Sequence, residues 1–228
     1  MPRLLAVGHV TWDRLQGRTV LGGSVTYATL TARKLGWEVA ALTAAGPDFE
    51  PERDLPGVTA FVTPSEATTR FVNDYGPDGT RRQVLSSRAA DVSLSIVPEP
   101  WRRPDVLLLG GVAGEIQGSA ALSFEAEVVG ANAQGWVRAF GPGGEVTPRE
   151  WERPDQSLAG VHALFLSRSR ACRARRSIPP APATCSRPRS SSATRRRATR
   201  RRRRCSRPAR PRAWWRASRP RPWATGRR

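Results

Sequence analysis

A carboxylate, a glycine pair and a phenol lie within a short segment near the start of this chain: Asp13, Gly22, Gly23 and Tyr27. Asp13 can accept hydrogen bonds from two hydroxyl groups at once, or else it caps its own loop. A glycine pair before a helix lets the backbone approach a ligand closely, although it also simply makes a tight turn. The ring of Tyr27 can stack on the apolar face of a sugar or donate a hydrogen bond, or else it packs on its own helix. These residue types are suited to a polyhydroxylated small molecule.

Further candidate residues follow the predicted strands. Glu115 and Gln134 each come shortly after a candidate strand, and open α/β sheets bind their ligands just beyond strand ends of this kind. A solvated loop position is the alternative for both residues. His9 is interpreted as a packed residue at a strand end rather than as a general base.

The elements that must position these residues alternate between strand and helix patterns. Apolar runs at residues 3–10 and 39–45 predict two buried strands. Between them, apolar residues recur at helical spacing from Val25 to Leu35, with Ser24 as the expected N-cap. Further buried strands are expected at residues 105–111, 127–131 and 161–166. A short helix is expected at 119–127, and the strand at 127–131 is expected to continue after a turn at 135–140. The order of strand, glycine turn, helix and strand indicates an α/β fold.

Residues 57–97 follow a different pattern. Apolar residues and threonines alternate through residues 58–63, and the turn Gly-Pro-Asp-Gly at residues 76–79 separates two further β-prone runs. Such a turn between two β-prone runs predicts a hairpin. We therefore expect exposed antiparallel strands here, separate from the buried sheet.

The glycines of the first helical unit recur with a recognisable spacing. The stretch LGGSVTYATLTARKLGWEVAALTAAGPD contains the glycine pair, then Gly36, then Gly46 and Asp48 as Gly-x-Asp. A Gly-x-x-x-x-Asp also runs from Gly8 to Asp13. This combination resembles the first signature of the ribokinase (PfkB) family of carbohydrate kinases, and the resemblance spans nearly all of residues 3–167.

The resemblance implies a ribokinase-like α/β sheet flanked by helices, incomplete at its C-terminal side, with a small β-lid at about residues 11–21 and 57–97. It implies ATP-dependent phosphorylation of a hydroxyl on a sugar or cyclitol, with Mg²⁺, beneath a lid that excludes water. The substrate-binding residues would be Asp13, Gly22, Gly23, Ser24, Tyr27, Glu115 and Gln134. A homodimer could form through the lid.

The chain departs from the family pattern at two positions of the helix. The family usually has Asn where this chain has Tyr27 and a small residue where it has Val25, so the usual contact with ribose is altered. The segments GHVTWD, GGSVTY and GANAQGWVR resemble a subgroup similar to inositol kinases.

The net charge of +19 divides sharply near residue 167. Residues 1–167 carry 15 basic and 19 acidic side chains, a balance of −4, whereas residues 168–228 carry 23 Arg and no Asp, Glu or Lys. The second segment has one aliphatic residue larger than Ala, Ile178. Low hydrophobicity with high charge predicts disorder. We therefore expect a partial kinase domain at 1–167 and a disordered Arg-rich tail at 168–228.

The catalytic elements that the resemblance implies have no counterpart in this tail. In the family a glycine-rich turn forms an anion hole and is followed by the catalytic Asp, in a GAGD-like motif. The tail contains one glycine, Gly226, and no acidic residue. We therefore assign no catalytic, cofactor-binding or metal-binding residue and expect an inactive form of the kinase. A frameshift near codon 168 of a GC-rich gene is our hypothesis for its origin.

Other partners and locations follow from composition. The arginines of the tail, together with Trp214 and Trp215, could bind nucleic acid nonspecifically through phosphate neutralisation and base stacking. No amphipathic apolar face accompanies them, so membrane binding is not expected. No signal peptide and no apolar run near the roughly 20 residues of a membrane span is present, which predicts a cytoplasmic protein.

Overall fold

The computed structural model describes residues 1–78 and 80–166, all within one compact unit. The tail expected at residues 168–228, with its expected disorder and nucleic-acid binding, lies outside the described residues. Within the described part, no helix is both long and apolar enough to cross a membrane.

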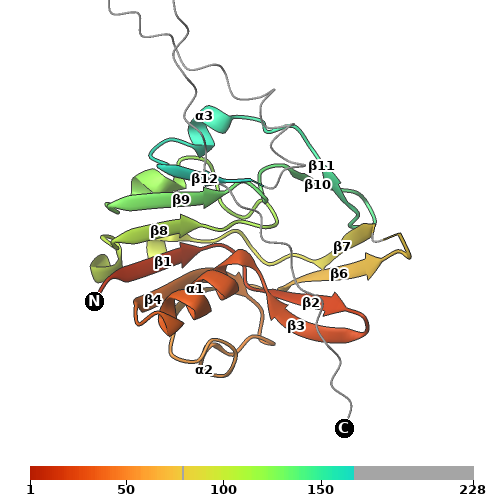
Figure 1. Cartoon of the computed structure of the whole chain (residues 1–228), viewed down its shortest axis with the longest axis horizontal. Helices are drawn as coiled ribbons and strands as arrows, with labels where there is room; N and C mark the ends of the chain where they lie inside the picture. Colours follow the sequence, from red (N-terminus) through yellow and green to blue (C-terminus); the bar gives the residue numbers. More distant parts are fainter. Residues whose placement is uncertain (79, 167–228) are drawn as a thin grey trace, which may run out of the picture. The chain divides into compact units, whose positions relative to one another are not determined.

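A six-stranded sheet forms the centre of this unit, in the order β12-β9-β8-β1-β4-β5, with every neighbouring pair parallel (Figure 1). Its strands are β1 (Arg3–Val7), β4 (Glu38–Ala45), β5 (Thr59–Pro64), β8 (Val106–Leu109), β9 (Val128–Asn132) and β12 (Ala163–Phe165). A parallel sheet that is covered on both faces needs apolar residues on both. In β1, Leu5 and Val7 pack in one core and Leu4 and Ala6 in the other. The expected α/β fold is confirmed.

The helix α1 (Ser24–Lys34) packs against β1 and β4. Its buried residues are Val25, Thr26, Thr29 and Ala32. The two threonines are accommodated because their hydroxyls donate to carbonyls one turn back, Thr26 to Gly22 at 2.6 Å and Thr29 to Val25 at 2.9 Å. Two threonines can therefore lie on the buried face of the helix without leaving a hydroxyl group unsatisfied.

Two expectations for this helix are wrong. Its N-cap is Gly23 rather than Ser24, and no side chain caps it. Gly23 has a φ of 93°, and a Cβ there would lie 2.4 Å from the carbonyl oxygen of His9, so the position requires glycine. Leu35, expected on the buried face, is 72% exposed because the helix ends at Lys34.

A second sheet of four strands, called here the small sheet, lies beside the carboxyl end of β1 (Figure 1). Its strands are β2 (Thr11–Leu15), β3 (Arg18–Gly22), β6 (Thr69–Tyr75) and β7 (Arg81–Ser87), in the order β3-β2-β6-β7. The β6–β7 pair is antiparallel, as the turn sequence predicted, whereas β2 and β6 are parallel.

The expectation of exposed antiparallel strands over the whole of residues 57–97 is wrong at its two ends. Strand β5 pairs in parallel with β4 and belongs to the six-stranded sheet. As an edge strand it is only half-buried, so it shows the same alternation as a strand of a solvated sheet. Beyond β7, the chain forms two 3₁₀ turns, η1 (Leu94–Ile96) and η2 (Glu99–Trp101).

The remaining described elements are short. They are α2 (Pro51–Asp54), η3 (Ala120–Ser123), β10 (Arg138–Phe140), β11 (Val146–Pro148) and α3 (Pro154–Ser157). The helix expected at 119–127 is therefore wrong: η3 is a single 3₁₀ turn, and the chain is extended again at Phe124. Strand β10 pairs with β11 in an antiparallel hairpin, so it does not extend the six-stranded sheet.

The substitution Gly23→Ala should lower the free energy of unfolding of the full chain by about 2 kcal/mol or more, because the new Cβ adds a clash to the strain of a positive φ. Gly36→Ala is the matched control, since Gly36 has a φ of 82° but nothing within 4 Å of its Cβ; strain alone costs about 1 kcal/mol. Urea denaturation measures both losses. Equal losses in the two variants would contradict this account.

Candidate functional site

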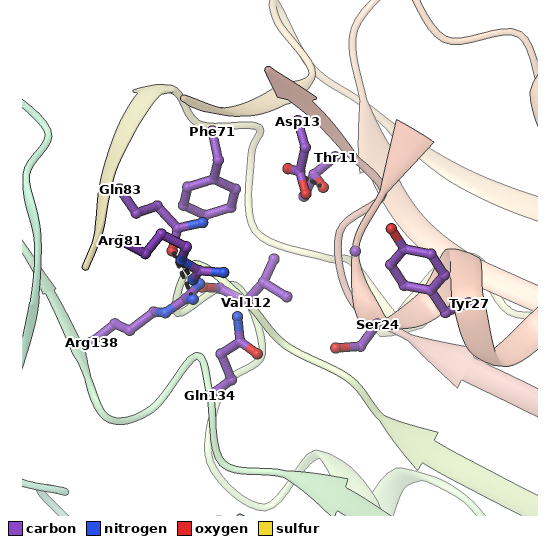
Figure 2. Close-up of a pocket in the computed structure, with 11 residues that line it drawn as sticks. Thr11, Asp13, Ser24, Tyr27, Phe71, Arg81, Gln83, Val112, Gln134 and Arg138 are labelled. Atoms are coloured by element: carbon purple, nitrogen blue, oxygen red, sulfur yellow. Dashed lines mark hydrogen bonds between the residues drawn. The ribbon is translucent and has the colours of Figure 1, made fainter. Parts of the chain in front are cut away.

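A pocket opens where the start of α1 and the loops after β8 and β9 meet the small sheet (Figure 2). Its volume is about 180 Å³, below the roughly 300–1,000 Å³ typical of drug-sized sites, so it suits a small ligand. Eleven residues line it: Thr11, Asp13, Gly23, Ser24, Tyr27, Phe71, Arg81, Gln83, Val112, Gln134 and Arg138. Five of the residues expected from sequence are therefore together, namely Asp13, Gly23, Ser24, Tyr27 and Gln134.

Asp13 lies on β2 with its carboxylate toward the pocket (Figure 2). The hydroxyl of Thr11 donates to its Oδ1 at 3.0 Å. Burial raises the pKa of Asp13, and the Thr11 hydrogen bond and the charges of Arg81 and Arg138 oppose that rise. Gly22 does not line the pocket, but a Cβ on it would lie 2.5 Å from Asp13 Oδ2. The glycine therefore leaves room for the carboxylate.

The start of α1 supplies a second wall. Ser24 is its first residue, and the Ser24 hydroxyl accepts a hydrogen bond from Asn132 Nδ2 at 3.0 Å, which connects the helix to the end of β9. Tyr27 is 61% exposed, so it lies at the rim rather than in the helix packing. Because the Gly23 backbone has no side chain above it, a ligand can approach the chain closely at this point.

Glu115 is not in the pocket, although it follows β8 as the sequence indicated. Its side chain is fully buried, and its carboxylate accepts backbone N–H groups of His9 at 2.8 Å, Val112 at 2.9 Å and Ala113 at 2.7 Å. It thereby holds the loop after β1 against the loop after β8. Its place in the fold is that of an internal acceptor for backbone groups.

His9 and Asp48 also make contacts that join the two sheets. The buried ring of His9 contacts Ala90 O through Nε2 at 2.8 Å and Thr69 Oγ1 through Nδ1 at 2.7 Å. A carbonyl only accepts, so Nε2 carries the proton and Thr69 donates to Nδ1. Burial lowers the pKa of His9. Asp48, of the Gly-x-Asp motif, accepts from Thr68 at 2.5 Å and pairs with Arg70.

The sequence patterns did not indicate two arginines of the pocket, Arg81 and Arg138. Arg138, at the start of β10, is 4% exposed and donates to Val112 O at 2.9 Å. Arg81 and Gln83 lie two residues apart on β7 and so share a face of the strand. The spacing of Arg81 and Gln83, and the position of Arg138 at the end of the GANAQGWVR segment, are the sequence features that could have indicated these arginines. No function was predicted for the two arginines because charged residues in a hairpin are usually solvated.

Gln134 faces Arg138 across the floor of the pocket (Figure 2). With its amide oxygen turned toward the guanidinium, it accepts hydrogen bonds from Nη1 at 2.8 Å and Nη2 at 2.5 Å. Its backbone N–H donates to Asn132 Oδ1 at 3.0 Å. Gln134 therefore reaches the pocket as expected, and its side chain helps to fix a cation there.

Among residues 1–78 and 80–166, no group of three His, Cys, Asp or Glu side chains could hold a metal ion. We therefore derive no chemical step through a metal in this part of the chain.

No protein-family model and no curated protein sequence matches the chain. Solved structures do match. A sulfate complex of a pyrophosphate-dependent kinase in the ribokinase family has a TM-score of 0.58 and 23% identity, over 71% of this chain and 60% of that chain. A pyrophosphate-dependent kinase in that family, complexed with a pyrophosphate analogue and myo-inositol, gives 0.57 and 22% over 71% and 60%. A pyrophosphate-dependent myo-inositol-1 kinase converted into a myo-inositol-3 kinase gives 0.59 and 20% over 71% and 58%.

These likenesses show that the chain has the ribokinase-like fold that the sequence resemblance implied. The chain spans about 60% of the length of those structures.

The substitution Glu115→Gln should lower the free energy of unfolding by about 3 kcal/mol, because the amide turns a donor toward backbone N–H groups that the carboxylate now satisfies. Glu127→Gln is the matched control, since Glu127 is exposed. Chemical denaturation of the full chain measures both. A loss no larger than that of the control would show that the Glu115 carboxylate does not hold the two loops together.

Proposed function

We propose that residues 1–167 form the acceptor-binding part of a ribokinase-like carbohydrate kinase and that the pocket binds a sugar or cyclitol. The observation that carries this proposal is the placement of Asp13, Ser24 and Gln134 around one small pocket at the carboxyl ends of parallel strands. Open α/β sheets bind their ligands in that position. A neighbour of the same fold is complexed with myo-inositol, which supports a polyhydroxylated ligand.

Each wall contributes a different contact to such a ligand. The Asp13 carboxylate accepts hydrogen bonds from two hydroxyls, while the backbone around Gly23 allows a close approach. The exposed ring of Tyr27 stacks on the apolar face of the polyol. The small sheet acts as a lid that limits the access of water to the bound hydroxyls.

We also propose that this chain does not transfer a phosphoryl group. The ribokinase resemblance implies an anion hole and a catalytic Asp toward the C-terminal side, with ATP and Mg²⁺. Residues 168–228 contain no acidic residue and one glycine, and the described residues offer no cluster for a metal. We therefore assign no phosphoryl-donor site and propose that this chain binds the acceptor without phosphorylating it.

Nonspecific nucleic-acid binding through residues 168–228 is the second candidate function. The composition of that segment, 23 Arg with Trp214 and Trp215 among its residues, supports it through phosphate neutralisation and stacking. Dimerisation through the lid and a cytoplasmic location stay predictions from the sequence.

The substitution Asp13→Asn should weaken the binding of a neutral polyol such as glucitol or myo-inositol by about tenfold, because an amide offers fewer acceptor sites and no charge. Asp74→Asn is the matched control: Asp74 lies on β6 in the same small sheet, exposed and outside the pocket. Isothermal titration calorimetry with the full chain measures both affinities. Equal affinities for the two variants would contradict the assignment of Asp13.

The full chain should yield no phosphorylated polyol above a mock purification, whether the donor is ATP with Mg²⁺ or pyrophosphate. The physical reason is the missing charge stabilisation and base that phosphoryl transfer requires. Detection of the phosphorylated product by mass spectrometry measures this. Turnover that scales with protein concentration and disappears in Asp13→Asn would overturn the inactive assignment.

A further inference from the structure

Two guanidinium groups of the pocket meet at one acceptor. Arg81 Nη2 and Arg138 Nη2 both donate to Gln83 Oε1, at 3.1 Å and 2.8 Å. Two cations that share a single neutral oxygen lie close together, and like charges at that separation repel each other. An oxyanion placed next to them offsets that repulsion.

The surroundings hold this pair of cations in place before any ligand arrives. Gln83 Nε2 donates to Asn73 Oδ1 at 2.8 Å, which turns the Gln83 oxygen toward the two arginines. Arg138 also donates to Val112 O and to the Gln134 amide oxygen, and it lies over the ring of Phe71, with 5.4 Å between its Cζ and the ring centroid. Groups that are already oriented lose little freedom on binding. Arg81 is exposed and can adjust to the ligand.

Asp13 faces the pocket from a different wall (Figure 2). Among the described residues that line the pocket, it is the only acidic one, and Arg81 and Arg138 are in the same lining. The lining therefore offers a hydrogen-bond acceptor on β2, the exposed guanidinium of Arg81 on β7 and the fixed positive charge of Arg138 on β10. A ligand that spans the pocket satisfies both when hydroxyls meet Asp13 and an anionic group meets the arginines. Guanidinium forks match the geometry of carboxylate and phosphate oxygens.

We propose that the pocket selects a polyol that itself carries a carboxylate or phosphate, with this oxyanion bound by the exposed guanidinium of Arg81 next to the positive charge of Arg138, and with the hydroxyls toward Asp13. The inference rests on the proposed function, since it assumes a polyol ligand. Beyond the proposed function, the inference specifies that the ligand is an anion and that Gln83 positions the two arginines.

Gluconate and glucitol test the charge, because they share a carbon skeleton and differ in whether one end is a carboxylate. Calorimetry with the full chain should show gluconate binding about tenfold more tightly than glucitol, as charge-assisted hydrogen bonds predict. Glucose 6-phosphate and inorganic phosphate are the further probes. They separate an oxyanion on the polyol from free phosphate.

The substitution Arg81→Gln should bring the ratio of the two affinities close to one. It suits the test because Arg81 is exposed and its loss should leave the fold intact. Arg82→Gln is the matched control: it removes the same charge from the next residue of β7, which lies opposite Asp74 in the register of β6 and β7 and does not line the pocket. Any attraction of anions to the arginines of residues 168–228 is the same in both variants.

Each outcome decides a different point. Equal affinity for gluconate and glucitol, or a preference that survives Arg81→Gln, overturns this inference and leaves the polyol pocket standing. Tight binding of inorganic phosphate with no gain for gluconate over glucitol also overturns it, since the arginines would then bind a free oxyanion. Failure of every polyol, charged or neutral, to bind contradicts the proposed function itself.

Discussion

The carboxylate of Glu115 holds together the two loops on which the pocket depends. Buried and without contact to solvent, it accepts backbone N–H groups of His9, Val112 and Ala113. Burying a carboxylate is costly unless hydrogen bonds compensate for the lost water, and three backbone donors supply that compensation. The loops after β1 and β8 are therefore fixed relative to each other at the edge of the sheet where ligands of this fold class bind.

Residues of these two loops in turn hold Arg138 of the pocket and the small sheet in place. Val112, held by Glu115 through its N–H, accepts the Nη1 hydrogen bond of Arg138 through its carbonyl. His9, held in the same way, contacts Thr69 at the start of β6 and so joins the small sheet to the six-stranded sheet. Arg138 and the small sheet are therefore both positioned by residues whose backbone N–H groups donate to the buried Glu115 carboxylate.

The sequence predicted the elements whose side chains carry strong periodic signals. The apolar runs of β1, β4 and β8 indicated buried strands, and the glycine spacing placed α1 and the residues from Gly23 to Tyr27. It did not separate β5 from the small sheet, because a half-buried edge strand alternates as a solvated strand does. Glu115 was assigned to the correct loop, but the direction of its side chain follows from three-dimensional packing that spacing does not encode. Arg81 and Arg138 come together only through the approach of two hairpins distant in sequence.

Hydrogen–deuterium exchange of the full chain with and without gluconate tests the central claim, that one polyol-binding pocket joins β2, the start of α1 and β7. The account predicts slower exchange in peptides covering residues 9–27, 69–87 and 110–138 when gluconate is added near its Kd for the unaltered chain, and a clearly smaller change in Asp13→Asn at the same gluconate concentration. Protection that is absent from these segments, or that is unchanged by Asp13→Asn, would contradict it.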